Sequence, residues 1–277
     1  MMEQLRWNAM ERIVTRIGII GFGFIGAGLY THVRADPTLG MEIAFVHNRS
    51  AARLNAVPVE LRTDSLEGML ARRADLIVEV AHPDFTRQHG ARFLENADYL
   101  PVSVSAFADA ALLERLRSAA AQSGRRLYIP HGALVGLDTL AEYRDSWRAV
   151  AITFIKNPAH IDFSESGFDP ATIRGETVVY DGPVRGIAAR FPRNVNTMVT
   201  CAIATVGVDR CHARLIAIPH QLTGVLEVVA QGHDGSVVTL RREQPMAGVS
   251  GTEMLASTLA SVLSAAQRRG HAPVEFV

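Results

Sequence analysis

Residues 17–26 read Ile17-Gly-Ile-Ile-Gly21-Phe-Gly23-Phe-Ile-Gly26, an apolar run that enters a Gly-x-Gly-x-x-Gly turn. Such a turn between a buried strand and a helix is typical of dinucleotide binding. The first glycine permits the tight turn, the second lets the backbone approach a pyrophosphate, and the third lets the helix pack against the strand. We therefore expect a dinucleotide to be bound by Gly21, Gly23, Phe24, Ile25 and Gly26. The alternative is a Gly-rich turn without a ligand.

The first half of the chain alternates between two kinds of segment. Short β-branched runs are followed by longer runs rich in Ala, Leu and Arg, up to about residue 138. This alternation predicts an α/β fold with a Rossmann-type doubly wound parallel sheet over residues 14–138. The predicted strands are Arg16–Ile20, Ile43–His47, Leu76–Val80, Leu100–Ser103 and Leu127–Ile129, and the predicted helices are Ala27–Ala35, Pro83–Asn96 and Asp109–Ser123.

After Leu140 the pattern changes to strands separated by turn residues. It predicts a second α+β domain over residues 139–250, with a mainly antiparallel sheet and turns at residues 181–183 and 232–235. A helix over Val195–Val206 is predicted with Asn194 as its N-cap, and a last helix over residues 251–268 is predicted to pack back on the first domain. The predicted strands are Ala149–Ile155, Glu176–Asp181, Ala213–Pro219, Val225–Gln231 and Ser236–Arg241.

Composition narrows the class of protein. The chain has 277 residues, with 28 basic and 28 acidic side chains, so no net field favours nucleic acid or an anionic membrane. No run of about eighteen apolar residues predicts a membrane span, and the start of the chain lacks a signal-peptide pattern. Two widely spaced cysteines and ten scattered histidines predict neither a disulfide framework nor a metal site. These features predict a cytoplasmic protein that acts on a small molecule.

The end of the second predicted strand bears on the choice of cofactor. An acid at this point reads the ribose of NAD, whereas a neutral residue followed by Arg tolerates the 2′-phosphate of NADP. The chain has Asn48 and Arg49 here, which predicts NADP or NAD with NADP favoured, unless Arg49 is only solvated. Ala81 and His82 follow the third strand at the same edge and are predicted to border the cofactor. His82 has an alternative role as the cap of the next helix.

Six stretches are specific enough to compare with known families. They are Gly21-Phe-Gly-Phe-Ile-Gly26, Phe45-Val-His-Asn-Arg49, Asp75-Leu-Ile-Val-Glu-Val-Ala-His-Pro83, His131-Gly-Ala-Leu-Val-Gly-Leu-Asp138, Asp181-Gly-Pro-Val-Arg-Gly186 and Phe191-Pro-Arg-Asn-Val-Asn-Thr197. In this order they resemble the L-aspartate dehydrogenase family. The resemblance implies a two-domain homodimer, joined through the second domain, that uses NAD or NADP to interconvert L-aspartate and iminosuccinate, which hydrolyses to oxaloacetate and ammonia.

The chain differs from that family at the position of the family's proposed acid/base residue. Where the family typically has Asp in Ala-Asp-Pro and His in Asn-x-His-Glu, this chain has Ile218 and Leu226. Leu226 is therefore predicted to make the substrate pocket more apolar than the family's. His220 is the nearest histidine in sequence and is a candidate replacement for the acid/base, with a plain loop role as the alternative.

Other candidate residues follow from the needs of a dicarboxylic substrate, whose carboxylates require charge-assisted donors. Asn194, Asn196 and the amides that begin their helix are predicted to bind substrate, with Lys156 as a compact positive partner in catalysis. The alternatives are that Asn194 only caps the helix and that Lys156 is solvated.

Residues 131–133 form a further candidate segment, since they follow a predicted strand near the place expected for the nicotinamide. Gly132 and Ala133 are predicted to contact the cofactor, and His131 is a candidate proton donor or a neutral loop residue.

Three functions remain open on these residues. The first is an NAD(P)-dependent amino-acid dehydrogenase. Without the histidine, oxidation of aspartate should be weak, because deamination needs a group that moves protons near neutral pH. The second is an imine reductase for a less polar substrate, because a preformed iminium needs mainly orientation. The third is a nucleotide-binding protein without activity. Another Rossmann oxidoreductase would share the fold and differ in the pocket.

Overall fold

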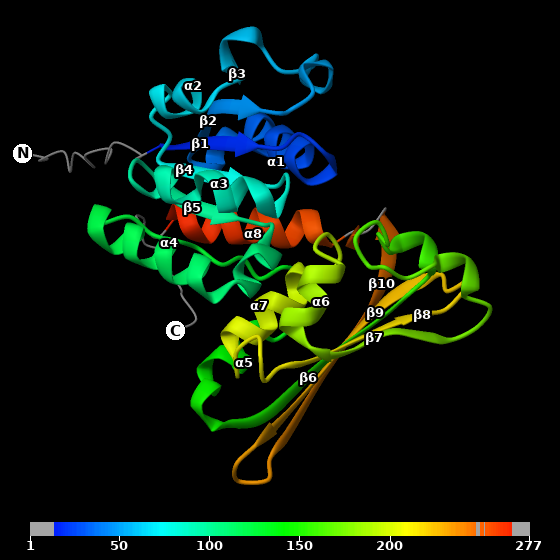
Figure 1. Ribbon diagram of the computed structural model, residues 1–277. Coiled ribbons are helices and arrows are strands. Elements are labelled where there is room, and N and C mark those ends of the chain that lie inside the picture. The colour runs from blue at the N-terminus through cyan, green and yellow to red at the C-terminus, as the bar shows by residue number, and fades with distance from the viewer. Residues whose placement is uncertain (1–13, 248–249, 252, 268–277) are drawn as a thin grey trace, which may run out of the picture.

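The computed structural model describes residues 14–247, 250–251 and 253–267, which form two sheets with their helices (Figure 1). The helices are α1 (Phe24–Ala35), α2 (Leu66–Ala71), α3 (Pro83–Leu94), α4 (Ala110–Ser123), α5 (Leu137–Glu142), α6 (Val184–Arg190), α7 (Asn196–Ala204) and α8 (Met254–Gln267). The strands are β1 (Thr15–Ile20), β2 (Met41–His47), β3 (Arg62–Thr63), β4 (Leu76–Glu79), β5 (Asp98–Pro101), β6 (Trp147–Lys156), β7 (Thr177–Pro183), β8 (His212–Ala217), β9 (Thr223–Gly232), β10 (Val237–Ala247) and β11 (Ser250–Gly251).

The first sheet is parallel, with strand order β3-β2-β1-β4-β5. Its apolar residues divide between two cores: Ile17 and Ile19 pack in one core with α1 and α8, whereas Ile20 packs in the other with α3 and α4. Burial on both faces explains why β1 and β4 read as continuous apolar runs. The order reverses at β1, which places a ligand crevice at the carboxyl ends of β1, β2 and β4. The predicted Rossmann-type sheet is confirmed.

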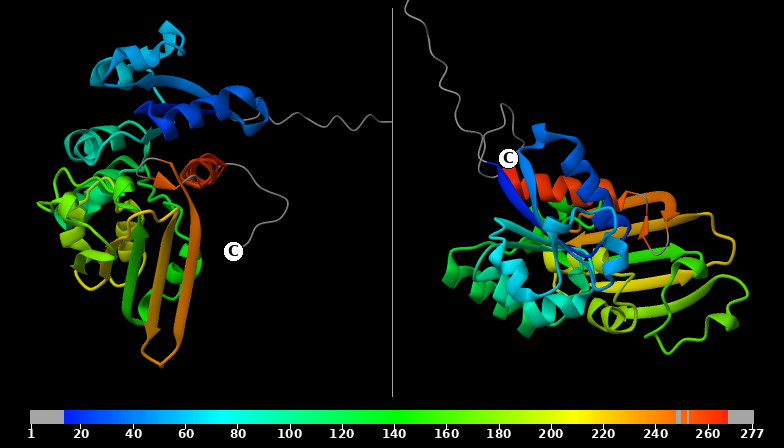
Figure 2. Two further views of the ribbon diagram at one scale, coloured as in Figure 1. Left: turned by 90° about the vertical axis from the view of Figure 1, so that its right-hand side faces the viewer. Right: turned by 90° about the horizontal axis from the view of Figure 1, so that it is seen from above.

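The second sheet has strand order β11-β10-β9-β6-β8-β7 and is antiparallel except for the parallel pair β6 and β8. It extends away from the first sheet (Figure 2). Helices α6 and α7 contact residues 104–108 of the first domain, and one apolar core joins Phe107 there with Met198 of α7 and Ile152 of β6. The predicted second domain with a mainly antiparallel sheet is confirmed. The shared core fixes the two sheets against each other.

Local differences from the predicted elements have physical causes. Residues 181–183 are not a turn but the end of β7, because Pro183 remains paired with His212 of β8. Leu127–Ile129 is not a strand, because only Leu127 makes a bridge, to Tyr99. The chain then leaves the sheet toward α7, whose Thr200 hydroxyl donates to the carbonyl of Pro130.

The prediction that Asn194 caps α7 is wrong. Val195 occupies the N-cap, and no side chain caps this helix. The Asn194 amide instead binds residues 160–162: its Oδ1 accepts from the Asp162 amide at 2.8 Å and its Nδ2 donates to the His160 carbonyl at 3.0 Å. Asn194 therefore fixes a neighbouring loop rather than the helix end.

Candidate active site

A wide cleft of about 1710 Å³ lies at the carboxyl ends of β1, β2 and β4. Pockets for drug-sized ligands typically have volumes of about 300–1,000 Å³, so this cleft suits a longer molecule. Its lining residues include most of the predicted cofactor contacts, namely Gly21, Gly23, Phe24, Ile25, Asn48, Arg49, Ala81 and His82, and also Asn196 from the second domain.

The glycine-rich loop fits a dinucleotide. Gly23 is the N-cap of α1, no side chain caps this helix, and a Cβ at Gly23 would meet nothing within 4 Å. The start of α1 therefore presents backbone amides to an open space, as phosphate binding requires. Gly26 does not line the cleft: a Cβ there would overlap the carbonyl oxygen of Gly21. Its role is to let α1 approach the loop.

The end of β2 forms one side of the wide cleft. The Asn48 side chain is used within the protein, since its Oδ1 accepts from the Phe22 amide at 3.0 Å and its Nδ2 donates to the Ser50 carbonyl. Three arginines, Arg49, Arg53 and Arg62, line this end. Their positive charge suits a phosphorylated ribose, and Asn48 holds the glycine-rich loop at Phe22.

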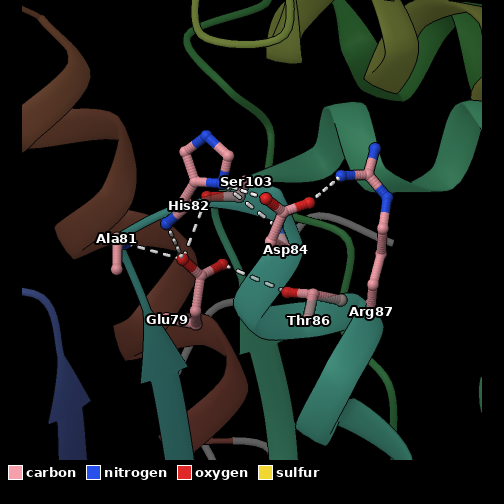
Figure 3. A network of polar contacts seen from close by, with 7 residues as sticks. All are labelled: Glu79, Ala81, His82, Asp84, Thr86, Arg87 and Ser103. Carbon is pink, nitrogen blue, oxygen red and sulfur yellow. Dashed lines mark hydrogen bonds and ion pairs between the residues drawn. The ribbon is translucent and has the colours of Figure 1, made fainter. Parts of the chain in front are cut away.

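A buried carboxylate organises the end of β4 (Figure 3). Glu79 Oε1 accepts from the backbone amides of Ala81 at 2.6 Å and His82 at 2.8 Å. The Ser103 hydroxyl donates to the same oxygen at 3.0 Å, and the Thr86 hydroxyl donates to Oε2 at 3.2 Å. Glu79 thus holds from behind the loop that borders the cofactor cleft.

Burial raises the pKa of Glu79 to about 7, against the lowering effect of its hydrogen bonds from Ala81, Ser103, His82 and Thr86. His82 caps the next helix, which was the alternative to a cofactor contact. It is the N-cap of α3, and its side chain accepts from the Asp84 amide. Both residues therefore shape the Val80–His82 segment.

A second, narrower cavity of about 50 Å³ lies between α7, the second sheet and the start of α8. We call it the inner pocket. Arg193 and Asn196 line both the inner pocket and the wide cleft, so the two cavities adjoin. The apolar side chains of the inner pocket are Phe154, Val225, Leu226, Met246 and Met254, and its polar ones are Lys156, Arg193, Asn194, Asn196, Thr197, Gln244 and Glu253.

Lys156 is the buried cation of the inner pocket. It ends β6, its Nζ lies 4.6 Å from the centre of the Phe154 ring, and it is not the solvated side chain of the alternative reading. Burial lowers the pKa of Lys156 to about 8, and attraction to Glu253 raises it in part. Lys156 therefore remains mostly protonated at pH 7 and can bind an anion.

The predicted segment 132–133 also lines the inner pocket. Ala133 has φ +59° and its amide donates to Ser257 of α8 at 2.9 Å, while the Thr197 hydroxyl donates to the Gly132 carbonyl. These bonds hold the loop between α7 and α8. Asn196 Oδ1 accepts from the Ser105 amide at 2.9 Å, and Asn196 lines both cavities.

Two candidate histidines lie elsewhere. His131 and His220 are exposed and line neither cavity, and the His131 ring lies 3.9 Å from Asp138. His220 sits in the loop after β8 with φ +63°. No histidine is among the described residues that line the inner pocket.

Sequence reasoning missed several residues of these cavities. Glu79 carries a local signal, because an acid within the apolar run 76–81 needs buried partners. Arg193 could have been found from its position, since it lies within the quoted stretch Phe191-Pro-Arg-Asn-Val-Asn-Thr197. Gln244 and Glu253 had no local signal, since only the packing of β10 and α8 brings them to the pocket.

Membrane spans and metal groups were sought across residues 14–247, 250–251 and 253–267. No helix in these ranges is long and apolar enough to cross a bilayer. Nor do three or more His, Cys, Asp or Glu side chains gather there as a potential metal group.

Comparison with known families gives two matches along the chain. The profile described as "Aspartate dehydrogenase, C-terminal" matches residues 138–268, and the one described as "Homoserine dehydrogenase, NAD binding domain" matches residues 21–130. The first match contains the inner pocket's strands, and the second contains the glycine-rich loop.

Individual relatives match over nearly the whole length. An aspartate dehydrogenase domain-containing protein of Xenopus tropicalis is 36% identical, over 92% of this chain and 95% of its own. An L-aspartate dehydrogenase of Ralstonia nicotianae is 33% identical, over 92% and 98%. The crystal structure of aspartate dehydrogenase from Thermotoga maritima aligns with a TM-score of 0.71 at 26% identity, over 95% of this chain and 99% of that one.

Proposed function

The chain belongs to the aspartate dehydrogenase family, and on this premise we propose that it interconverts an α-amino acid such as L-aspartate with its imine, and through the imine with the 2-oxo acid. In its broader functional class, the chain is an aspartate dehydrogenase-like, NAD-binding oxidoreductase. The substrate, the cofactor preference and the roles of single residues are our proposals.

One observation carries the proposal: the dinucleotide-sized cleft adjoins a small pocket that contains a buried lysine. Hydride transfer requires the substrate carbon beside the nicotinamide, and the junction at Arg193 and Asn196 supplies that adjacency. A carboxylate bound by Lys156 would place the neighbouring carbon toward the junction. Charge-assisted contacts of this kind are strong in a pocket that excludes water.

We propose NADP(H) as the favoured cofactor. The residues fit a dinucleotide, since the open position at Gly23 and the uncapped start of α1 suit the pyrophosphate. Arg49 and Arg53 at the end of β2 suit a 2′-phosphate. When bound, a nicotinamide would supply the hydride transfer, and Ala81, His82, Gly132 and Ala133 are the proposed neighbours of that end.

The protein's residues would bind and orient more than they move protons. Lys156 and Arg193 would bind carboxylate groups, and Asn196 would donate from Nδ2. General acid/base help is worth about two to four decades in rate. Since Leu226 supplies none, and His131 and His220 line neither cavity, we propose that reduction of a protonated imine is faster than oxidation of the amine.

A second candidate is an imine reductase for a less polar substrate. It is favoured by the apolar wall that Leu226 forms with Phe154 and Met246.

We further propose that residues 14–138 and 139–250 form the two domains, and that two copies of the chain form a homodimer joined through the second sheet. The family resemblance supports both proposals.

The test is an assay of both directions with both cofactors. Oxidation of NADPH and NADH is followed with oxaloacetate plus ammonia and with 2-oxobutyrate plus ammonia, and L-aspartate oxidation is followed with NAD⁺ and NADP⁺. We expect reduction to exceed oxidation, and 2-oxobutyrate to be preferred if the second candidate is right. Tight NADPH binding without reduction of any 2-oxo acid would contradict an enzymatic role.

A further inference from the structure

Two acceptor oxygens in the inner pocket lack a donor within the part of the chain that the structure describes. Oε2 of Glu253 and Oε1 of Gln244 are buried, and neither accepts a hydrogen bond from the described residues. Gln244 lies on β10 opposite Gly224, and Glu253 immediately precedes α8. They come from different elements, but they line the same pocket as Leu226 and Lys156.

Such oxygens need a donor, because a buried acceptor without a partner costs free energy, and a carboxylate costs more than an amide. Neighbouring side chains do not meet this need. Leu226, Met246, Phe154 and Met254 carry no strong donor, and Lys156, although it is attracted to Glu253, makes no hydrogen bond to either of these two oxygens. A small cation with several N–H groups would satisfy both oxygens at once.

The positive end of the pocket complements this pair. Lys156 and Arg193 attract carboxylates, whereas Glu253 and Gln244 attract a cation. An α-amino acid carries both groups on one carbon, and its iminium keeps the positive nitrogen. The pocket therefore has the charge pattern of a zwitterion over a volume of about 50 Å³.

We propose that Glu253 and Gln244 form the amine subsite of the inner pocket and accept hydrogen bonds from the positively charged nitrogen of the amino acid or of its iminium. This inference rests on the proposed function and adds to it the residues that recognise the reacting nitrogen. The pocket that has Leu226 where the family resemblance implies a histidine thus contains a carboxylate from another element.

Affinity for matched pairs of ligands, with and without the amino group, tests the proposal. Calorimetric titration compares L-aspartate with succinate, and L-2-aminobutyrate with butyrate, on protein saturated with NADPH, with which an amino acid cannot react. A hydrogen-bonded charge is worth about a ten- to hundredfold difference in affinity. We expect the wild type to bind the amino acid of at least one pair more tightly than its deaminated partner by that factor.

Glu253→Gln should reduce this preference to a few-fold and leave the affinity for the deaminated partner within about threefold. The matched control is Glu243→Gln on β10, where the half-exposed Glu243 carboxylate accepts from Thr223, and it should keep the wild-type preference. An unchanged preference in Glu253→Gln would overturn the amine subsite while the proposed function stands. An equal loss for both members of a pair would also overturn it, because Glu253 would then act only through Lys156.

Two further outcomes are separable. If the wild type binds NADPH but no amino or deaminated acid, the proposed function fails and the subsite fails with it. If Glu253→Gln does not fold by circular dichroism, Gln244→Met decides: a two- to tenfold drop in the preference supports the subsite, and no drop overturns it.

Discussion

The glycine-rich part of the wide cleft and the inner pocket are built from different kinds of groups. The glycine-rich loop and the start of α1 present backbone amides from residues close together in sequence, and side chains such as Arg49 and Asn196 complete the cleft from farther along the chain. The inner pocket presents side chains from residues 132 to 254, on α7, on strands β6, β9 and β10, and before α8. A backbone site keeps its ligand while side chains vary, whereas a single substitution such as Leu226 changes what the inner pocket can do.

The largest expected effect is in the inner pocket. Leu226→His places an acid/base group where the family resemblance implies one, and L-aspartate oxidation should rise by about two to four decades. Steady-state rates with NADP⁺ and NAD⁺ measure the gain. Leu222→His is the matched control, because Leu222 is exposed just before β9 and lines neither cavity. If both variants remain as slow as the wild type, the loss of histidine does not limit the reaction.

Glu79 is an exception to this comparison. It is a side chain, yet it shapes the wide cleft, because it accepts hydrogen bonds from the backbone amides of Ala81 and His82. Its pKa of about 7 in the folded protein lies above the ordinary 4.5, so the folded state holds a proton that the unfolded state releases between these values. Stability should therefore fall as pH rises from about 4.5 to 7, by up to about 3 kcal/mol from this group. Glu79→Gln should remove that part of the decline.

Urea unfolding at pH 5, 6 and 7 measures this effect as a difference between the two proteins. Glu42→Gln is the control, since its exposed carboxylate pairs with Arg16 on the surface, and it should keep the wild-type slope. Parallel curves for the wild type and Glu79→Gln would show that Glu79 has an ordinary pKa.

Substitutions at two glycines of the cleft should have different effects, one on stability and the other on NADPH affinity. Gly26→Ala places a Cβ against the Gly21 carbonyl and should cost about 1–3 kcal/mol of stability, read as a lower melting temperature. Gly23→Ala meets open space, so its melting temperature should not change, but NADPH affinity should fall about tenfold because the methyl occupies the path of the pyrophosphate. Unchanged NADPH affinity in Gly23→Ala would place the dinucleotide elsewhere.

The smallest expected effect concerns cofactor choice. Arg49→Ala should weaken NADPH binding about five- to tenfold, which corresponds to about 1 kcal/mol for a partly exposed charge contact. NADH binding should change less than twofold. Fluorescence titration of both reduced cofactors gives the ratio, with Arg34→Ala at the end of α1 as the control. Equal weakening of NADPH and NADH would mean that Arg49 contacts no 2′-phosphate.

The parallel sheet and the glycine-rich loop were predictable because their signals are local. An apolar run, three spaced glycines and a helical pattern follow one another within twenty residues, from Arg16 to Ala35. Helix α1 nevertheless begins at Phe24 rather than Ala27, since a helix boundary depends on hydrogen bonds such as Ala27 N to Gly23 O.

The inner pocket was only partly predictable. Lys156, Asn194, Asn196 and Leu226 were named from chemistry and resemblance, and the structure brings all four to one pocket. The histidine nearest in sequence, His220, lies outside it, because distance along a strand and loop does not give the direction of a side chain. Glu253 joins the pocket only through the packing of α8 against the first domain.

The two ends of the wide cleft stand on different strands. Arg49 and Arg53 follow β2, Glu79 ends β4, and β1 separates them with no residue shared between the two groups. Free-energy effects of substitutions at sites without shared partners usually add. If the end of β2 sets the cofactor preference as proposed, selection or an engineer could change it without altering the end of β4, so that cofactor preference and substrate choice would be free to evolve as separate modules.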